Sequence, residues 1–65
     1  MTLTPRELEV LALVAAGATA YAAGRRLGCA TRTVDKHLQR AYAKLGVSDR
    51  VTAVLAAQRL GLLGG

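Results

Sequence analysis

Residues 24–34 read GRRLGCATRTV, and this stretch decides how the chain folds. Gly24 lies inside an expected helix, where a missing side chain lets another backbone come close. Gly28 follows at the end of that helix, where a left-handed residue commonly turns the chain. The apolar Cys29 and Val34 come next, at spacings that suit two crossing helices. Two helices joined by a short glycine-containing turn form a helix-turn-helix, although an ordinary helical hairpin also fits this pattern.

The close approach predicted at Gly24 sets limits on what can replace it. Alanine raises helix propensity by about 1 kcal/mol and adds only one methyl group. We therefore expect Gly24→Ala to be tolerated or stabilising, and Gly24→Leu to overpack the crossing between the two helices.

The first helix has a clear start signal in the sequence. Thr4 is placed to cap it, Pro5 fits its first position, and Glu7 completes a capping box with Thr4. Gly17 is expected to end it. Its expected core face consists of Leu8, Leu11, Val14 and Ala15.

Capping and glycine signals place three more helices along the chain. Their expected ranges are residues 20–27 capped by Thr19, residues 31–45 stopped by Gly46, and a last helix from a cap at Ser48 or Asp49 to Gly61. The sequence therefore predicts an all-α fold of four helices, forming one domain over residues 1–65.

The composition limits the classes of protein to which the chain can belong. Of its 65 residues 52% are hydrophobic, without Phe or Trp, which favours close-packed helices over strands. Cys29 is the only cysteine, so it cannot form an internal disulfide, and we expect a small buried hydrophobe. No apolar run reaches the roughly 20 residues needed to cross a bilayer, and the N-terminus lacks signal-peptide features. The expected location is cytoplasmic, with no membrane partner.

The positive charge of the chain is concentrated in its middle. Seven of its nine Lys and Arg residues lie between Arg25 and Arg50, against two Asp residues, so this stretch carries the whole net charge of +5. Four of these residues keep a step of four along the third helix: Arg32, Lys36, Arg40 and Lys44. Like charges repel at that spacing, so the stripe makes sense if a polyanion neutralises it. Double-stranded DNA is the leading candidate.

The third helix should carry apolar and polar side chains on opposite faces. At 100° per residue the apolar face consists of Val34, Leu38, Ala41 and Leu45. The opposite face combines charge with amide and carboxylate groups that hydrogen-bond to base edges. We expect base contacts from Asp35, Lys36 and Gln39, and phosphate contacts from Arg40 and Lys44 at the edge of this face.

Each of these assignments has a simpler alternative. Asp35 is equally well explained by an ion pair with Arg32 one turn earlier, and the other two expected base readers by a solvated face. The hydroxyl of Tyr21 reaches a phosphate or only solvent. His37 and Tyr42 are expected at the edge of the core rather than as ligands or catalysts.

Several segments together resemble the LuxR-type DNA-binding domain, over about residues 3–63. They are Leu3-Thr4-Pro5-Arg6-Glu7-Leu8-Glu9-Val10-Leu11, Leu27-Gly28, Thr33-Val34 followed by His37, and Lys44-Leu45-Gly46-Val47 with Arg50. The resemblance implies a four-helix domain of bacterial transcription regulators, with the third helix in the major groove and the fourth pairing two copies. We expect no cofactor, no metal and no small-molecule ligand, and RNA polymerase is a candidate partner.

By position, the resemblance also implies which residues take part. Base contacts correspond to Asp35, Lys36 and Gln39, and phosphate contacts to Thr19, Tyr21, Arg32, Thr33 and Arg40. In the fourth helix it places Ala53, Val54, Ala57 and Leu60 on the inner face. The expected dimer surface is then Val51, Thr52, Leu55 and Arg59.

The chain departs from the family pattern at three places. Ala30 replaces the serine that usually caps the third helix, so its start loses a cap unless Thr31 takes over. Ala22 and Ala23 replace a glutamate and a larger aliphatic residue. Asp35 stands where relatives often have lysine, which changes the preferred DNA sequence.

Other functions fit the sequence less well than that of a DNA-binding regulator. The promoter-reading fourth region of a sigma factor shares a similar turn, but the stop at Gly46-Val47 and a complete fourth helix argue against it. A helical protein-interaction module would lack salt-sensitive DNA binding. An enzyme is not expected, because one His, one Cys and four carboxylates are scattered along the chain.

Overall fold

The computed structural model describes residues 3–63, which contain four helices and no strand. The helices are α1 (Pro5–Ala15), α2 (Ala20–Leu27), α3 (Thr31–Leu45) and α4 (Arg50–Arg59). The predicted all-α fold of four helices is therefore confirmed. The predicted end of the last helix was two residues too late, since Leu60 is its C-cap. None of these helices within residues 3–63 is long and apolar enough to cross a membrane.

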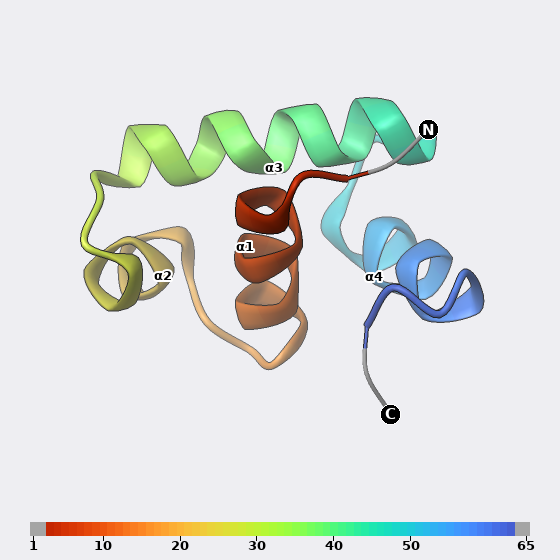
Figure 1. Cartoon of the computed structure of the whole chain (residues 1–65), viewed down its shortest axis with the longest axis horizontal. Helices are drawn as coiled ribbons and strands as arrows, with labels where there is room; N and C mark the ends of the chain where they lie inside the picture. Colours follow the sequence, from red (N-terminus) through yellow and green to blue (C-terminus); the bar gives the residue numbers. More distant parts are fainter. Residues whose placement is uncertain (1–2, 64–65) are drawn as a thin grey trace.

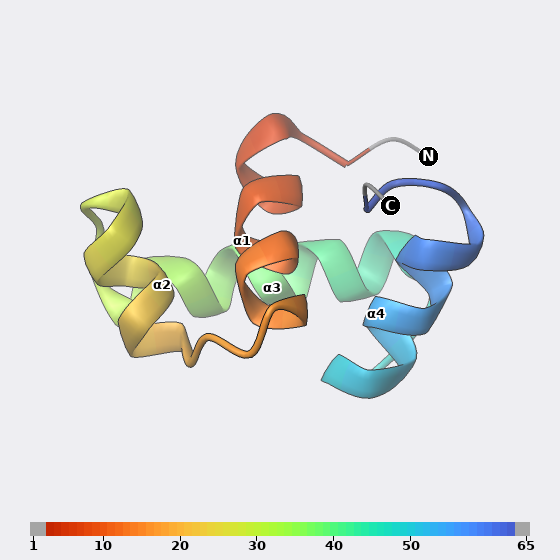
Figure 2. The same ribbon diagram turned by 90° about the horizontal axis from the view of Figure 1, so that it is seen from below.

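The longest helix, α3, lies along one edge of the molecule, and the other three helices all lie on the same side of it (Figure 1). Helix α1 crosses the middle of α3, while α2 and α4 lie beside the N-terminal and C-terminal parts of α3. The view from below shows the same order, with α1 between α2 and α4 (Figure 2). One face of α3 is thus covered by protein, and its outer face is open.

Two groups of buried side chains hold the helices together, and α1 contributes to both. The first consists of Leu3, Leu11, Ala41, Ala53 and Ala57. The second consists of Val10, Val14, Ala23, Val34 and Leu38. The half-buried Tyr42 packs against both groups. The apolar face predicted for α3 is confirmed at Val34, Leu38 and Ala41, with Leu45 half-buried.

Two details of the predicted core were wrong. In α1 the structure buries Val10, which was not predicted, and exposes Ala15, because the buried stripe is rotated around the helix relative to the predicted one. In α4 the predicted inner residues Ala53 and Ala57 are buried, but Leu60 is 66% exposed. Leu60 lies just beyond the last turn of α4, where the chain turns away from α1.

The helix ends follow the predicted capping chemistry. The Thr4 hydroxyl accepts a bond of 3.2 Å from the Glu7 amide, and the Glu7 carboxylate accepts one of 2.9 Å from the Thr4 amide. Asp49, rather than Ser48, caps α4 by accepting a 2.9 Å bond from the Thr52 amide. Helix α3 starts after Ala30 with no side-chain cap, so of the two alternatives that the sequence left open, Thr31 does not take over the cap. These caps fix where α1 and α4 begin, whereas α3 is held mainly by packing.

Gly24 lies where the backbones of α2 and the following turn come together. A Cβ atom at this position would lie 2.6 Å from the carbonyl oxygen of Cys29 and 3.4 Å from Cγ2 of Val34. The predicted close approach is therefore confirmed. The expectation that Gly24→Ala is tolerated is reversed, because even one methyl group overlaps a backbone atom.

We predict that Gly24→Ala destabilises the chain by about 1–3 kcal/mol, because the turn must shift to relieve the overlap. Urea unfolding followed by circular dichroism measures the change. The matched variant Ala22→Gly, at an exposed position of the same helix, should cost about 1 kcal/mol through helix propensity alone. If Gly24→Ala instead gained a similar amount, the approach of Cys29 to Gly24 would place no constraint on the fold.

Candidate nucleic-acid interface

The open face of α3 carries most of the residues predicted to contact DNA. The expected base readers Asp35, Lys36 and Gln39 are all exposed, and so are Arg32, Thr33 and Arg40. They occupy the side of α3 opposite its buried residues, the side that no other helix covers in Figure 1. The structure therefore brings these six side chains onto one continuous surface.

The charged groups of this surface have no partners within the described part of the chain. Residues 3–63 contain two ion pairs, Arg6 with Glu9 at 3.7 Å and Lys44 with Glu7 at 2.8 Å. The alternative in which Asp35 pairs with Arg32 is not seen. The carboxylate of Asp35 and the cations around it thus stay available to an external partner.

Lys44 differs from the other basic residues of α3. Its ammonium group donates a 2.8 Å hydrogen bond to Oε1 of Glu7, whose side chain is only 3% exposed. Glu7 stands in the first turn of α1, so the ion pair joins the start of α1 to the end of α3. The structure gives Lys44 a partner inside the fold, and its predicted phosphate contact stays untested.

The Glu7 carboxylate is held in its charged form by its neighbours. The hydrogen bond from Lys44 and a second from the Thr4 amide lower the pKa of Glu7 below its ordinary value of 4.5, although burial alone would raise it. The cap of α4 acts in the same direction, since bonds from the amide and hydroxyl of Thr52 lower the pKa of Asp49. Burial raises the pKa of Tyr42.

Helix α2 carries the two remaining predicted phosphate contacts. The Thr19 hydroxyl accepts a 3.1 Å bond from the Ala22 amide and caps the helix. Tyr21 is 62% exposed, and its hydroxyl accepts a long bond of 3.5 Å from Nη1 of Arg25. Arg25 was counted in the basic stretch, but the sequence gave it no role of its own. Arg25 lies four residues after Tyr21, and side chains at that spacing are neighbours on a helix, so the sequence alone could have predicted this contact.

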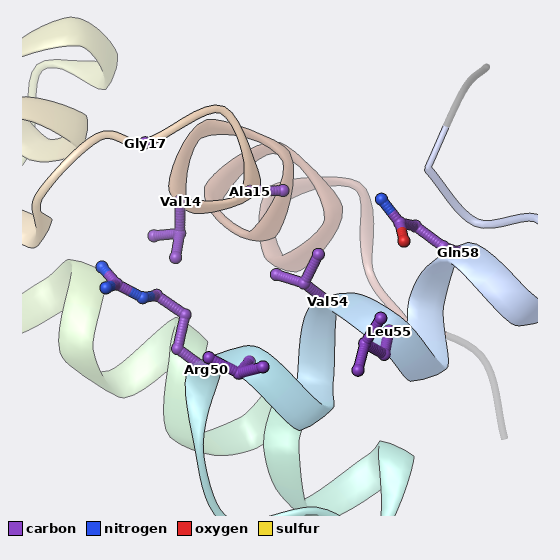
Figure 3. Close-up of a pocket in the computed structure, with 8 residues that line it drawn as sticks. Val14, Ala15, Gly17, Arg50, Val54, Leu55 and Gln58 are labelled. Carbon is purple, nitrogen blue, oxygen red and sulfur yellow. The ribbon is translucent and has the colours of Figure 1, made fainter.

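A second exposed surface, on α4, is apolar. Val51 and Leu55 are 67% and 52% exposed, beside the exposed Thr52 and Arg59. They border a shallow groove of about 480 Å³ between α4 and the end of α1. Figure 3 shows Arg50 and Gln58 at opposite ends of this groove, with Val54 and Leu55 between them. Neither Arg50 nor Gln58 had been assigned to this surface.

Residues considered for other chemistry do not come together. Cys29 and His37 are both half-buried, Cys29 in the turn and His37 on α3, so the full burial expected of Cys29 is not seen. Within residues 3–63 no group of three or more His, Cys, Asp or Glu side chains could hold a metal ion.

The short turn between α2 and α3, the close contact at Gly24 and the open face of α3 define a helix-turn-helix protein. Residues 1–57 match the family described as "Bacterial regulatory proteins, luxR family". The chain belongs to this family.

Similar proteins agree with this classification. The chain is 49% identical over 61 residues to the probable transcriptional regulatory protein NarL of Mycobacterium tuberculosis, and 44% identical over 61 residues to the transcriptional activator RamA of Corynebacterium glutamicum. These matches cover 94% of this chain but only 28% and 22% of the relatives. The chain thus spans about a quarter of the length of these relatives.

Two solved structures share the fold. The transcription factor GerE superposes with a TM-score of 0.90 at 34% identity, covering 98% of this chain and 97% of GerE. The response regulator ChrA of a heme-sensing two-component system superposes with a TM-score of 0.92 at 33% identity, covering 97% of this chain and 31% of ChrA.

We predict that the Glu7–Lys44 ion pair makes the fold sensitive to acid. Because the pKa of Glu7 is lower in the folded chain, its contribution is complete above about pH 5 and is lost as the pH falls through the folded value. Glu7→Gln keeps the oxygen needed by the capping box but loses the charge. It should lower the free energy of unfolding by about 1–3 kcal/mol at neutral pH and flatten the loss in acid.

Urea unfolding at a series of pH values measures both effects. Asp35→Asn serves as the control, because it removes a carboxylate from an exposed site of α3 that belongs to neither ion pair and leaves the Glu7–Lys44 pair in place. An acid profile of Glu7→Gln that matches the parent would show that Lys44 does not stabilise the Glu7 charge in solution.

Proposed function

We propose that this chain binds double-stranded DNA in a sequence-specific manner, with α3 in the major groove. The observation that supports this most is the open, cationic and unpaired face of α3, placed on a helix-turn-helix scaffold. An α-helix fits the width of the major groove, and this face presents the donors and acceptors that distinguish base pairs. Bacterial DNA lies in the cytoplasm, so this role places the chain there. We assign residues 1–65 to one DNA-binding domain.

The side chains of α3 divide into two kinds of contact. Lys36 donates to guanine O6 and N7, Gln39 pairs with adenine N6 and N7, and Asp35 accepts from cytosine N4. Arg32 and Arg40 bind phosphates at the groove walls and fix the register of the helix without reading sequence. Thr19, Tyr21 and Thr33 add neutral hydroxyl donors to the phosphate contacts. Lys44 is left out of this set, because Glu7 holds its ammonium group.

We predict different losses from two neighbouring substitutions on α3. Arg40→Ala should weaken binding to all duplexes alike and reduce the slope of log affinity against log salt by about 0.9. Gln39→Ala should cost about 1–3 kcal/mol at one base pair and leave the slope unchanged. Fluorescence anisotropy over a salt series, on duplexes selected from random sequence by the parent, measures both. A uniform loss from Gln39→Ala would remove this residue from base reading.

We further propose that two copies pair on DNA through α4. Val51 and Leu55 leave an apolar patch on a small chain, and a two-fold dimer requires such a self-complementary surface. Thr52 and Arg59 form its polar rim. Two copies related in this way read inverted half-sites about 34 Å apart, one helical turn of DNA. Pairing that occurs only on DNA is consistent with the small size of the patch.

We predict that Leu55→Glu abolishes cooperative occupation of the second half-site while the circular dichroism spectrum stays helical. The carboxylate introduced at position 55 would lose water at the interface and would repel the same carboxylate of the second copy. Leu60→Glu makes the same chemical change at an exposed leucine just beyond the last turn of α4, and should bind as cooperatively as the parent. Gel-shift titrations on duplexes with one and two half-sites measure cooperativity. Equal cooperativity in Leu55→Glu and the parent would place the dimer surface elsewhere.

One further partner and one alternative function complete the proposal. RNA polymerase contact by a bound regulator fits the relatives described as transcriptional regulators. The alternative function is that of a helical protein-interaction module. The absence of DNA binding at every salt concentration tested would favour it.

A further inference from the structure

The exposed flank of α2 carries a second cluster of hydrogen-bond donors outside α3. Tyr21 and Arg25 stand one turn apart on this helix, and both are exposed. Nη1 of Arg25 donates to the Tyr21 hydroxyl at 3.5 Å. A bond of this length is weak and adds little to the stability of the fold. It does place the Tyr21 hydroxyl and the Arg25 guanidinium next to each other.

The contacts of α2 fix the direction in which this flank faces. With Ala20 set at zero and 100° per residue, Gly24 lies at about 40°, Tyr21 at about 100° and Arg25 at about 140°, whereas Arg26 lies at about 240°. Gly24 packs on the turn and on Val34 of α3. Arg26 lines a groove with Glu9 and Leu13 of α1. Tyr21 and Arg25 therefore lie beyond the contact with α3, on the side away from α1.

This flank adjoins the N-terminal end of α3. Figures 1 and 2 both show α2 beside that end of α3, joined to it by the short turn. When the second helix of a helix-turn-helix lies in the major groove, the first crosses the DNA backbone. When a duplex lies along the open face of α3, the phosphates of one of its strands therefore lie next to Tyr21 and Arg25 on α2.

The chemistry of the pair suits an anionic oxygen. Helix α2 contains no acidic residue, and Arg25 belongs to neither ion pair found within residues 3–63. Because the Tyr21 oxygen accepts from Arg25, the phenol proton is free to donate outward. The remaining guanidinium N–H groups present a fork that matches phosphate.

We propose that Tyr21 and Arg25 together form a binding site for one backbone phosphate of DNA, in which Arg25 supplies the charge and Tyr21 a second donor. This inference rests on the proposed DNA-binding function. It gives Arg25 a role that the sequence analysis did not assign, and it couples Tyr21 to a charged neighbour. The site binds the DNA backbone in the same way whatever the base sequence, and it fixes the position of α2 on one strand of the duplex.

The test compares two adjacent arginines of equal charge. Arg25→Ala should reduce the salt slope of binding by about 0.9, equally on a selected duplex and on an unrelated duplex. Arg26→Ala, which removes the same charge from the α1 side of α2, should leave the slope close to that of the parent. Tyr21→Phe should weaken binding without changing the slope, because a neutral donor displaces no counterion. In the Arg25→Ala background, Tyr21→Phe should cost less than it does alone.

Each outcome decides the proposal, provided that thermal melts show all variants folded. Equal slopes for Arg25→Ala and Arg26→Ala, whether reduced or unchanged, would overturn it, since Arg25 would then act only through net charge or not at all. Additive losses from Tyr21→Phe and Arg25→Ala would overturn the shared site. A parent chain without salt-dependent binding to either duplex would instead refute the proposed function itself.

Discussion

The buried Glu7 carboxylate is the contact on which the arrangement of the helices depends. It accepts hydrogen bonds from the Thr4 amide and from the ammonium group of Lys44, and so serves both as a helix cap and as one half of an ion pair. A charge buried without partners is strongly unfavourable, so any shift of α3 along α1 that separated Lys44 from Glu7 would be penalised. The ion pair therefore reinforces, at the end of α3, the register that apolar packing against α1 establishes along the rest of the helix.

Local signals made much of the fold predictable. The Thr4–Glu7 capping box, the cap at Thr19 and the glycine at the end of α2 depend on residues a few positions apart, and the structure contains all three. The division of α3 into a buried and an open face also followed from helical periodicity. These features need no knowledge of how distant segments meet.

The features that sequence reasoning missed involve segments far apart in the chain. The ion pair of Lys44 was not predicted, because its partner, Glu7, lies 37 positions earlier. Val10 is buried because α1 packs against helices on more than one side, which periodicity within α1 does not reveal. The effect of Gly24→Ala was misjudged because it depends on one carbonyl oxygen of the turn. The likeness to the luxR family supports the fold and the class of protein, while the individual DNA contacts remain proposals.

Tyr42 has a consequence for how the chain loses its structure. It packs against both groups of buried side chains, which otherwise lie on the two sides of α1. Helices α1 and α3 already contribute buried residues to both groups, and Tyr42 adds a side chain in direct contact with each group, which opposes separate opening of the α2 half and the α4 half. A side chain common to both halves ties their opening together and favours a single cooperative transition. The helix whose open face we propose to bind DNA thereby also helps the two halves of this small protein to melt together.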